Sequence, residues 1–262
     1  MILRRLGNKK AIAHKIIPHF PPHKIFISPF FGAGGMFFNK PKAKYNIVND
    51  LDSDVFNLFQ VVMNQKEELE KAFYLMPIHS DLLAYWKINK ETDPIKKALR
   101  FLFLSNLIEP TTGNIQRKVY DNSKKRITEN MDKTFELLQD VRFDNKDFEV
   151  FLKHLYWNPE RPREKENSFI YNDPPYLSTA SNYESKDWNK SDVIRLFDAN
   201  EKTGCKFAIS EFDNEFVIEE AKRRNLNIII IGERQNLKNR RVEILITNYK
   251  NNPSLFDGLG CL

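Results

Sequence analysis

Short apolar segments alternate with amphipathic ones along most of the 262-residue chain, and this alternation limits the fold more than any other feature. The segments expected to form strands are 24–28, 45–48, 141–143, 168–171, 205–210, 226–231 and 241–249. Helical patterns separate most of them, and 53–65 is an example in which the apolar residues share one face. Strands that alternate with helices predict a Rossmann-like α/β fold, with a mostly parallel sheet and helices on both faces.

The alternation is interrupted between about residues 58 and 134. The chain there has helical patterns up to residue 108, and the segment 109–130 then breaks them. We therefore expect one α/β domain made of residues 1–57 and 135–250. Residues 58–134 would form an inserted, mainly helical subdomain, and residues 251–262 a C-terminal tail.

Composition excludes several classes of protein. No apolar run approaches the ~20 residues that a membrane span needs. The N-terminus lacks the apolar core of a secretory signal. The two cysteines, Cys205 and Cys261, belong to no CxxC or Cys/His cluster, and the five histidines show no metal-binding spacing. We expect a cytoplasmic protein without disulfides or a bound metal.

The net charge of +6 favours a polyanionic partner without proving one. Positive charge is concentrated locally in two runs, "NIQRKVYDNSKKRI" (114–127) and "RQNLKNRR" (234–241). Either run could be a solvated loop, so charge alone leaves the question open.

A glycine loop, "ISPFFGAGG", follows the first strand. Gly32, Gly34 and Gly35 allow the backbone to approach a ligand closely, and the amides at the next helix start can face its polar groups. Glycines alone would suit a tight structural turn equally well. Asp50 ends the next strand 18 residues after Gly32, however, and is placed to accept hydrogen bonds from ribose hydroxyls. The pattern is GxGG rather than GxGxxG, which favours a nucleoside cofactor over a dinucleotide.

A second polar turn, Asp173-Pro174-Pro175-Tyr176, follows the strand 168–171 and should lie along the same edge of the sheet. The two prolines fix two φ angles, so the turn is stiff. Such a turn is often a plain connector. It also suits methyl transfer to an exocyclic amine, because Asp173 and the Pro174 carbonyl could each accept one N–H and free the nitrogen lone pair. Tyr176 would then offer a face to a base taken out of the duplex.

The order of these motifs resembles the Dam-type family of DNA adenine-N6 methyltransferases, in its alpha-type arrangement, over about residues 4–250. The stretches that carry the resemblance are "RRLGNKK", "PFFGAG", "NIVND", "NKDFEVFL", "NDPPY" and "NRRVEILITNY". The resemblance implies a methyltransferase fold, S-adenosylmethionine as cofactor, and the helical insert as a target-recognition domain for double-stranded DNA.

The resemblance also implies roles for individual residues. The catalytic residues would be Asp173, Pro174, Pro175 and Tyr176. Cofactor contacts would come from Gly7, Lys9, Phe30, Gly32, Gly34, Asp50, Asp147, Phe148 and Asp173. The basic runs and the loop after the catalytic turn would contact DNA through Asn114, Gln116, Arg117, Lys118, Lys124, Lys125, Arg126, Tyr183, Lys238, Arg240 and Arg241.

Two features depart from the family pattern. Glu211 stands where the family usually has Asn, and the insert lacks the hairpin of GATC-specific members, so GATC should not be assumed as the target. A cytosine-N4 or RNA methyltransferase and a catalytically silent DNA-binding relative remain alternatives. Asp rather than Ser at position 173 favours adenine.

The tail contains Ser254-Leu255-Phe256, which is similar to part of the short peptides that dock on bacterial sliding clamps. It lacks their leading Gln, and a tail without a partner is the simpler interpretation. We expect a monomer in solution.

Overall fold

The structure is a computed structural model that describes residues 1–5, 7–117, 123–158, 160–161, 163–177, 188–236 and 239–250. Within these ranges it leaves out the side chains of 234–236 and 239–240, and with them that of Arg240. The predicted DNA contacts Lys118, Tyr183 and Lys238 lie outside the described residues, as does the tail with its proposed clamp motif.

In the described part of the chain, seven strands form one sheet in the order β3-β2-β1-β4-β5-β7-β6. They are β1 (Ile25–Ser28), β2 (Tyr45–Asn49), β3 (Val141–Asp144), β4 (Ser168–Asn172), β5 (Lys206–Phe212), β6 (Asn227–Asn236) and β7 (Asn239–Thr247). The first five strands of this order run parallel, and β7 lies antiparallel to both β5 and β6. The predicted α/β fold with a mostly parallel sheet is confirmed.

Helices cover both faces of the sheet. The α-helices are α1 (Ala13–Ile16), α2 (Ser53–Asn64), α3 (Lys66–Leu75), α4 (Ser80–Ile88), α5 (Pro94–Asn106), α6 (Lys125–Glu129), α7 (Met131–Leu138), α8 (Phe148–Lys153), α9 (Lys190–Thr203) and α10 (Glu215–Arg223). Short 3-10 helices are η1 (Lys9–Ala11), η2 (Ile17–His19) and η3 (Phe37–Asn39). None of the helices in the described ranges combines the length and the apolar character that crossing a membrane requires.

Two hydrophobic clusters lie on opposite faces of the sheet. One contains Phe26 of β1 and Tyr171 of β4 and extends into α1, α2, α3 and α5. The other contains Ile27 and Ile170 of the same strands and extends into α8, α9 and α10. Because successive residues of a strand point to opposite faces, the central strands are buried on both sides, which explains their continuous apolar sequence.

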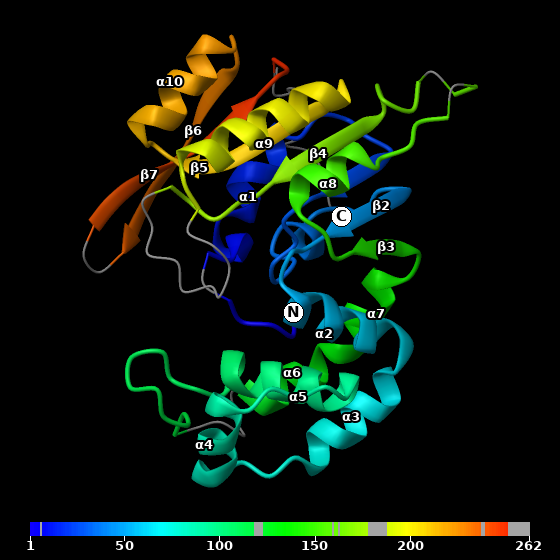
Figure 1. Ribbon diagram of the computed structural model, residues 1–262, viewed down its shortest axis with the longest axis vertical. Helices are drawn as coiled ribbons and strands as arrows, with labels where there is room; N and C mark the ends of the chain where they lie inside the picture. Colours follow the sequence, from blue (N-terminus) through cyan, green and yellow to red (C-terminus); the bar gives the residue numbers. More distant parts are fainter. Residues whose placement is uncertain are drawn as a thin grey trace, which may run out of the picture.

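The helical unit, residues 53–138, begins with α2 directly after β2 and ends with α7 before β3. Helices α3 to α6 form a lobe away from the sheet, and α2 and α7 lie between this lobe and the sheet (Figure 1). The predicted boundary at residue 58 falls inside α2, which packs against both β3 and the helices of the lobe.

Local sequence signals account for several helix ends. The side chain of Asp93 accepts the amide of Lys96, and Pro94 occupies the first turn of α5. Gly204 ends α9 with φ 69°, the left-handed conformation that glycine adopts most readily. After the glycine loop the chain forms only the 3-10 helix η3, where the sequence indicated a helix start.

The N-terminal segment packs directly on the glycine loop at Gly35. A Cβ atom added to Gly35 would lie 2.2 Å from Asn8 Oδ1 and 3.0 Å from the backbone nitrogen of Lys9. Real Cβ atoms do not show contacts as short as the one to Asn8 Oδ1, so a side chain at position 35 would force Asn8 to shift and would crowd the backbone of Lys9.

We expect Gly35→Ala to lower the free energy of unfolding by about 1–3 kcal/mol, because the new methyl group overpacks this contact. Denaturant unfolding measures the change. The double variant Asn8→Ala/Gly35→Ala should recover part of the loss, since it removes the nearest atom. A wild-type stability for Gly35→Ala would contradict the close docking.

Candidate active site

The two motif-bearing loops meet where the strand order reverses. β1 and β4 are adjacent and parallel, with Ile27 opposite Ile170. From β1 the chain adds β2 and β3 on one side, and from β4 it adds β5 on the other. In open α/β sheets such a switch point opens a crevice at the carboxyl ends of the strands. The glycine loop and the predicted catalytic turn, residues 173–176, therefore lie at the same edge of the sheet.

The end of β4 is fixed before the catalytic turn begins. Asn172 is fully buried, and its Nδ2 donates to Asn200 Oδ1 at 2.9 Å and to the carbonyl of Ala208 at 3.1 Å. These bonds tie the last residue of the strand to α9 and β5. The stiff turn therefore follows directly after a residue whose side chain is fixed.

The carboxylate of Asp173 is bound from the protein interior by Lys9. Lys9 Nζ lies 2.7 Å from Asp173 Oδ1 and donates to the carbonyl of Gly7 at 3.2 Å. The Lys9 side chain is 2% exposed and that of Asp173 is 22% exposed. The ammonium thus lies behind the carboxylate, which keeps part of its surface toward solvent. In this structure Lys9 is bound to the catalytic turn, and its contact with a cofactor stays a prediction.

The ring of Tyr176 is held at several points. It packs edge-on against Phe212, with centroids 4.6 Å apart and planes at 85°. Its hydroxyl donates to the carboxylate of Glu243, and Lys9 Nζ lies 4.3 Å from the ring centroid. Burial, together with the charges of Asp173 and Glu243, raises the pKa of Tyr176 well above its ordinary value. The hydroxyl therefore stays a hydrogen-bond donor.

Glu211, the residue at the usual Asn position, contacts the backbone at the end of the catalytic turn. Its Oε2 accepts the amide of Leu177 at 3.3 Å, and its Oε1 accepts the amide of Phe212 at 2.9 Å. Burial raises the pKa of Glu211 to about 8; the two amides and Lys9 oppose this shift, and the nearby Glu243 adds to it. One carboxylate oxygen of Glu211 thus binds the backbone just after the catalytic turn, and the other binds the backbone of its own strand.

Glu243 is a functional candidate that the sequence analysis missed. It is 2% exposed and lies in β7, opposite Phe212 of β5. The signal that could have revealed it is a single acid within the otherwise apolar run "VEILI".

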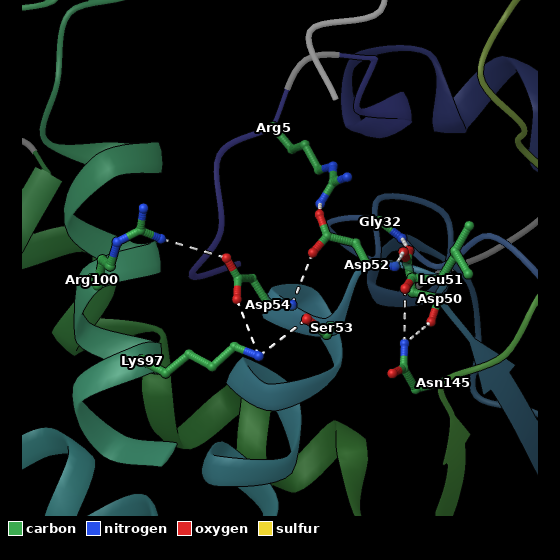
Figure 2. A network of polar contacts seen from close by, with 10 residues as sticks. All are labelled: Arg5, Gly32, Asp50, Leu51, Asp52, Ser53, Asp54, Lys97, Arg100 and Asn145. Atoms are coloured by element: carbon green, nitrogen blue, oxygen red, sulfur yellow. Dashed lines mark hydrogen bonds and ion pairs between the residues drawn. The ribbon is translucent and has the colours of Figure 1, made fainter. Parts of the chain in front are cut away.

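At the end of β2, Asp50 organises the edge of the glycine loop (Figure 2). Its Oδ2 accepts the amide of Gly32 at 2.6 Å, and its Oδ1 accepts the amide of Asp52 at 2.9 Å. Asn145 Nδ2 donates to the Asp50 carbonyl at 2.7 Å. Burial raises the pKa of Asp50, while Arg5 and the two amides act in the opposite direction.

Buried Asn49 joins the glycine loop to the loop that precedes α8. Its Nδ2 donates to the carbonyls of Pro29 and Lys146, each at 2.9 Å, and its Oδ1 accepts the Lys146 amide at 2.9 Å. The next residue is Asp147, which caps α8 by accepting the Glu149 amide at 3.0 Å. Asn49 therefore fixes the distance between two of the predicted cofactor-binding loops.

An aromatic cluster lies beside Asp147. The ring centroid of Phe148 is 5.4 Å from that of Phe30 and 5.7 Å from that of Trp188. Arg195 donates to Asp147 Oδ1 at 3.0 Å, and its guanidinium carbon lies 4.9 Å from the Phe148 centroid. Neither Trp188 nor Arg195 was predicted from the sequence.

The residues along this edge fit a nucleoside cofactor. Gly32 has φ +55°, and a Cβ atom added there would meet nothing within 4 Å, so its exposed side is open to a ligand. Gly34 has φ +72° and packs against Phe38. Each oxygen of Asp50 has a second lone pair for a hydroxyl donor. The Asp147 carboxylate and the nearby aromatic rings provide an acceptor and apolar surface for a base.

Three of the predicted DNA contacts in the helical unit make bonds within the protein. Gln116 Nε2 donates to the carbonyls of Asn106 and Ile108 at 3.0 and 3.2 Å. Lys124 Nζ donates to the carbonyl of Tyr74 at 2.9 Å, at the end of α3. Arg126 donates to Asn106 Oδ1 at 3.3 Å.

The other described candidates face solvent or the catalytic turn. Asn114 and Arg117 are exposed, and the side chain of Lys125 is 68% exposed. The Arg241 guanidinium carbon lies 5.2 Å from the ring centroid of Phe212, the residue that packs on Tyr176. The structure therefore separates two groups of cations, one in the helical unit and one beside the catalytic turn.

A family model of the D12 class N6 adenine-specific DNA methyltransferases matches residues 6–237. The chain belongs to this family. This confirms the predicted resemblance to the DNA adenine-N6 methyltransferases.

Named relatives agree with the family. The chain is 25% identical to the modification methylase StsI of Streptococcus sanguinis over 280 residues, which cover 95% of this chain and 42% of that protein. It is 29% identical to the DNA adenine methylase of Salmonella typhi over 109 residues, 39% of each protein. It is 24% identical to the type II methyltransferase M1.LlaDCHI of Lactococcus lactis subsp. cremoris, with 94% of this chain and 93% of that protein covered. The matches span less than half the length of the first two relatives.

The pKa of Glu211 predicts a pH-dependent stability. Between its ordinary value of 4.5 and about 8, the folded protein keeps a proton on Glu211 that the unfolded chain releases. Stability therefore falls as pH rises through this window. Glu211→Gln cannot ionise, so its free energy of unfolding relative to wild type should increase from about pH 5 to about pH 8, by on the order of 2–3 kcal/mol.

Denaturant unfolding at several pH values measures this difference. Glu219→Gln, the same substitution at an exposed position of α10, serves as the control and should show a constant difference. A constant difference for Glu211→Gln as well would show that Glu211 has an ordinary titration in the folded protein.

Proposed function

We propose that this protein transfers a methyl group from S-adenosylmethionine to N6 of an adenine that it flips out of double-stranded DNA at a specific sequence. The observation that carries the proposal is the partly exposed carboxylate of Asp173, held from behind by buried Lys9 at 2.7 Å. It lies at the switch point of the sheet, beside the glycine loop.

The catalytic turn suits an exocyclic amine. The N6 lone pair of adenine is delocalised into the ring and is a weak nucleophile. Asp173 would accept one N–H and the Pro174 carbonyl the other, which favours the geometry that frees the lone pair. With one oxygen of Asp173 fixed by Lys9, the carboxylate does not have to reorient when the base enters. Bound S-adenosylmethionine supplies the electrophilic methyl group.

Tyr176 would stack on the flipped base. Adenine must leave the helical stack for its amine to be reached, and an aromatic face offsets part of the lost stacking. The hydroxyl bond to Glu243 and the edge contact with Phe212 fix the plane of the ring before the base arrives. Arg241, next to Phe212, is positioned to bind a phosphate near the flipped nucleotide.

The cofactor would lie along the edge formed by the ends of β1, β2 and β3. Asp50 would accept its ribose hydroxyls, and Asp147 its adenine amine, with Phe148 and Phe30 packing on the adenine ring. Gly32 and Gly34 would allow the backbone to approach the cofactor closely. Asn49 supports this arrangement because it holds the Asp50 and Asp147 loops together.

The helical unit would recognise the DNA sequence through Asn114 and Arg117 and through Lys125 at the start of α6. Two relatives are named as a modification methylase and a type II methyltransferase, which supports a role in a restriction–modification system. The monomeric state, the cytoplasmic location and the clamp contact stay predictions from the sequence.

Incubation with tritiated S-adenosylmethionine and unmethylated genomic DNA, followed by nucleoside analysis, tests the activity. We expect label in N6-methyladenine and a loss of about 10²–10⁴-fold in Asp173→Asn. Asp81→Asn, an exposed position on α4, should keep the wild-type rate. Label in N4-methylcytosine, or label with RNA and not with DNA, would overturn the proposal.

The DNA contacts are tested by the salt dependence of binding. We expect Arg117→Gln and Lys125→Gln each to reduce the slope of log K against log salt concentration by about 1, because each removes one phosphate contact. Lys124→Gln should instead lower thermal stability with little change of slope, since Lys124 caps α3. Fluorescence anisotropy at several salt concentrations measures the slope, and unchanged slopes for the first two variants would remove these residues from the interface.

A further inference from the structure

Glu243 is a buried charge at a position where an apolar residue would continue the strand. Its neighbours in β7, Ile244, Leu245 and Ile246, belong to the core on both faces of the sheet. Moving a carboxylate from water into such surroundings is strongly unfavourable unless it is paired. The contacts of Glu243 therefore indicate the role of this buried carboxylate.

Two contacts of Glu243 lead to the catalytic turn. Its Oε1 accepts the hydroxyl of Tyr176 and lies 3.7 Å from Lys9 Nζ. Lys9 in turn lies 2.7 Å from Asp173 Oδ1 and 4.3 Å from the centroid of the Tyr176 ring. The Glu243 carboxylate thus contacts both Lys9, which binds Asp173, and Tyr176 at the end of the turn.

The charges around Lys9 explain why a second carboxylate is needed. With Asp173 as its only close counter-ion, the ammonium would be drawn fully to that carboxylate and would weaken it as a hydrogen-bond acceptor. Glu243 is a second counter-ion, with its Oε1 3.7 Å from the ammonium. The lysine is then bound to two acids behind the turn.

We propose that Glu243 is a positioning residue for methyl transfer, which holds Lys9 and the Tyr176 hydroxyl so that Asp173 presents its exposed oxygen to the target amine. This inference rests on the proposed function, because it assigns Asp173 and Tyr176 the roles given above. Glu243 itself touches neither base nor cofactor in this scheme.

The test compares Glu243→Gln, Lys9→Met and the double variant with wild type. Glu243→Gln keeps the size of the side chain and an acceptor for Tyr176 but removes the charge shared by Lys9. Glu219→Gln on α10 is the matched control. Three quantities are measured for each protein: the affinity for S-adenosylhomocysteine, the affinity for DNA, and the single-turnover rate of N6-methyladenine formation.

We expect Glu243→Gln to lower the single-turnover rate by about 10- to 100-fold while both affinities stay within about twofold of wild type. A merely structural role would instead change the affinities and the melting temperature together. Because Glu243 acts through Lys9, the loss in the double variant should be smaller than the product of the two single losses, by a factor of about 10.

A folded Glu243→Gln variant with the wild-type rate would overturn the inference, and so would a double variant whose loss equals the product of the single losses. If Glu243→Gln melts early, the rate of the double variant is compared with that of Lys9→Met; the two should agree, because a residue that acts through Lys9 has no further effect once Lys9 is replaced, and a lower rate in the double variant would overturn the inference. Failure of the proposed function is distinct, since wild-type protein would then form no N6-methyladenine.

Discussion

The position of the catalytic turn depends on the contact between Lys9 and Asp173. Lys9 lies in the N-terminal segment, and Asp173 follows β4, so the contact closes a long loop of chain across the sheet. The same segment packs closely on Gly35 of the glycine loop. The N-terminal segment therefore contacts both the glycine loop and the catalytic turn.

The same N-terminal segment connects the helical unit to the site. The amino group of Met1 donates to Asn130 Oδ1 at 3.0 Å, between α6 and α7. Arg5 binds Asp52 at 2.8 Å, and the amide of Asp52 donates to Asp50 Oδ1. Asp54, near the start of α2, pairs with Lys97 of α5 at 3.3 Å (Figure 2). The helical unit is therefore joined to the Asp50 loop by ion pairs and hydrogen bonds as well as by the chain itself.

The sequence predicts those features that depend on local patterns. The alternation of strands with helices predicted the mostly parallel sheet. Pro94 and Gly204 mark the ends of α5 and α9 because capping is decided within one turn of helix. Contacts between distant segments could not be predicted in the same way. No residue near Lys9 in the chain indicates that its ammonium reaches Asp173. A basic run also has the same sequence pattern whether its side chains face solvent or bind backbone carbonyls of a neighbouring helix, as Lys124 does.

Buried charge at this edge opposes stability, and its persistence there is an argument for function. Asp173, Glu211 and Glu243 lie near a single buried lysine, Lys9. Burial, together with the nearby Glu243, raises the pKa of Glu211 to about 8, so this carboxyl keeps its proton near neutral pH. Apolar side chains of similar volume would stabilise such a site more than a paired lysine does. The two apolar cores on either face of the sheet supply the stability that the edge lacks. A fold selected for stability alone would have filled the space behind the catalytic turn with Leu or Met; the charges there are explained if the turn must hold an amine in one orientation.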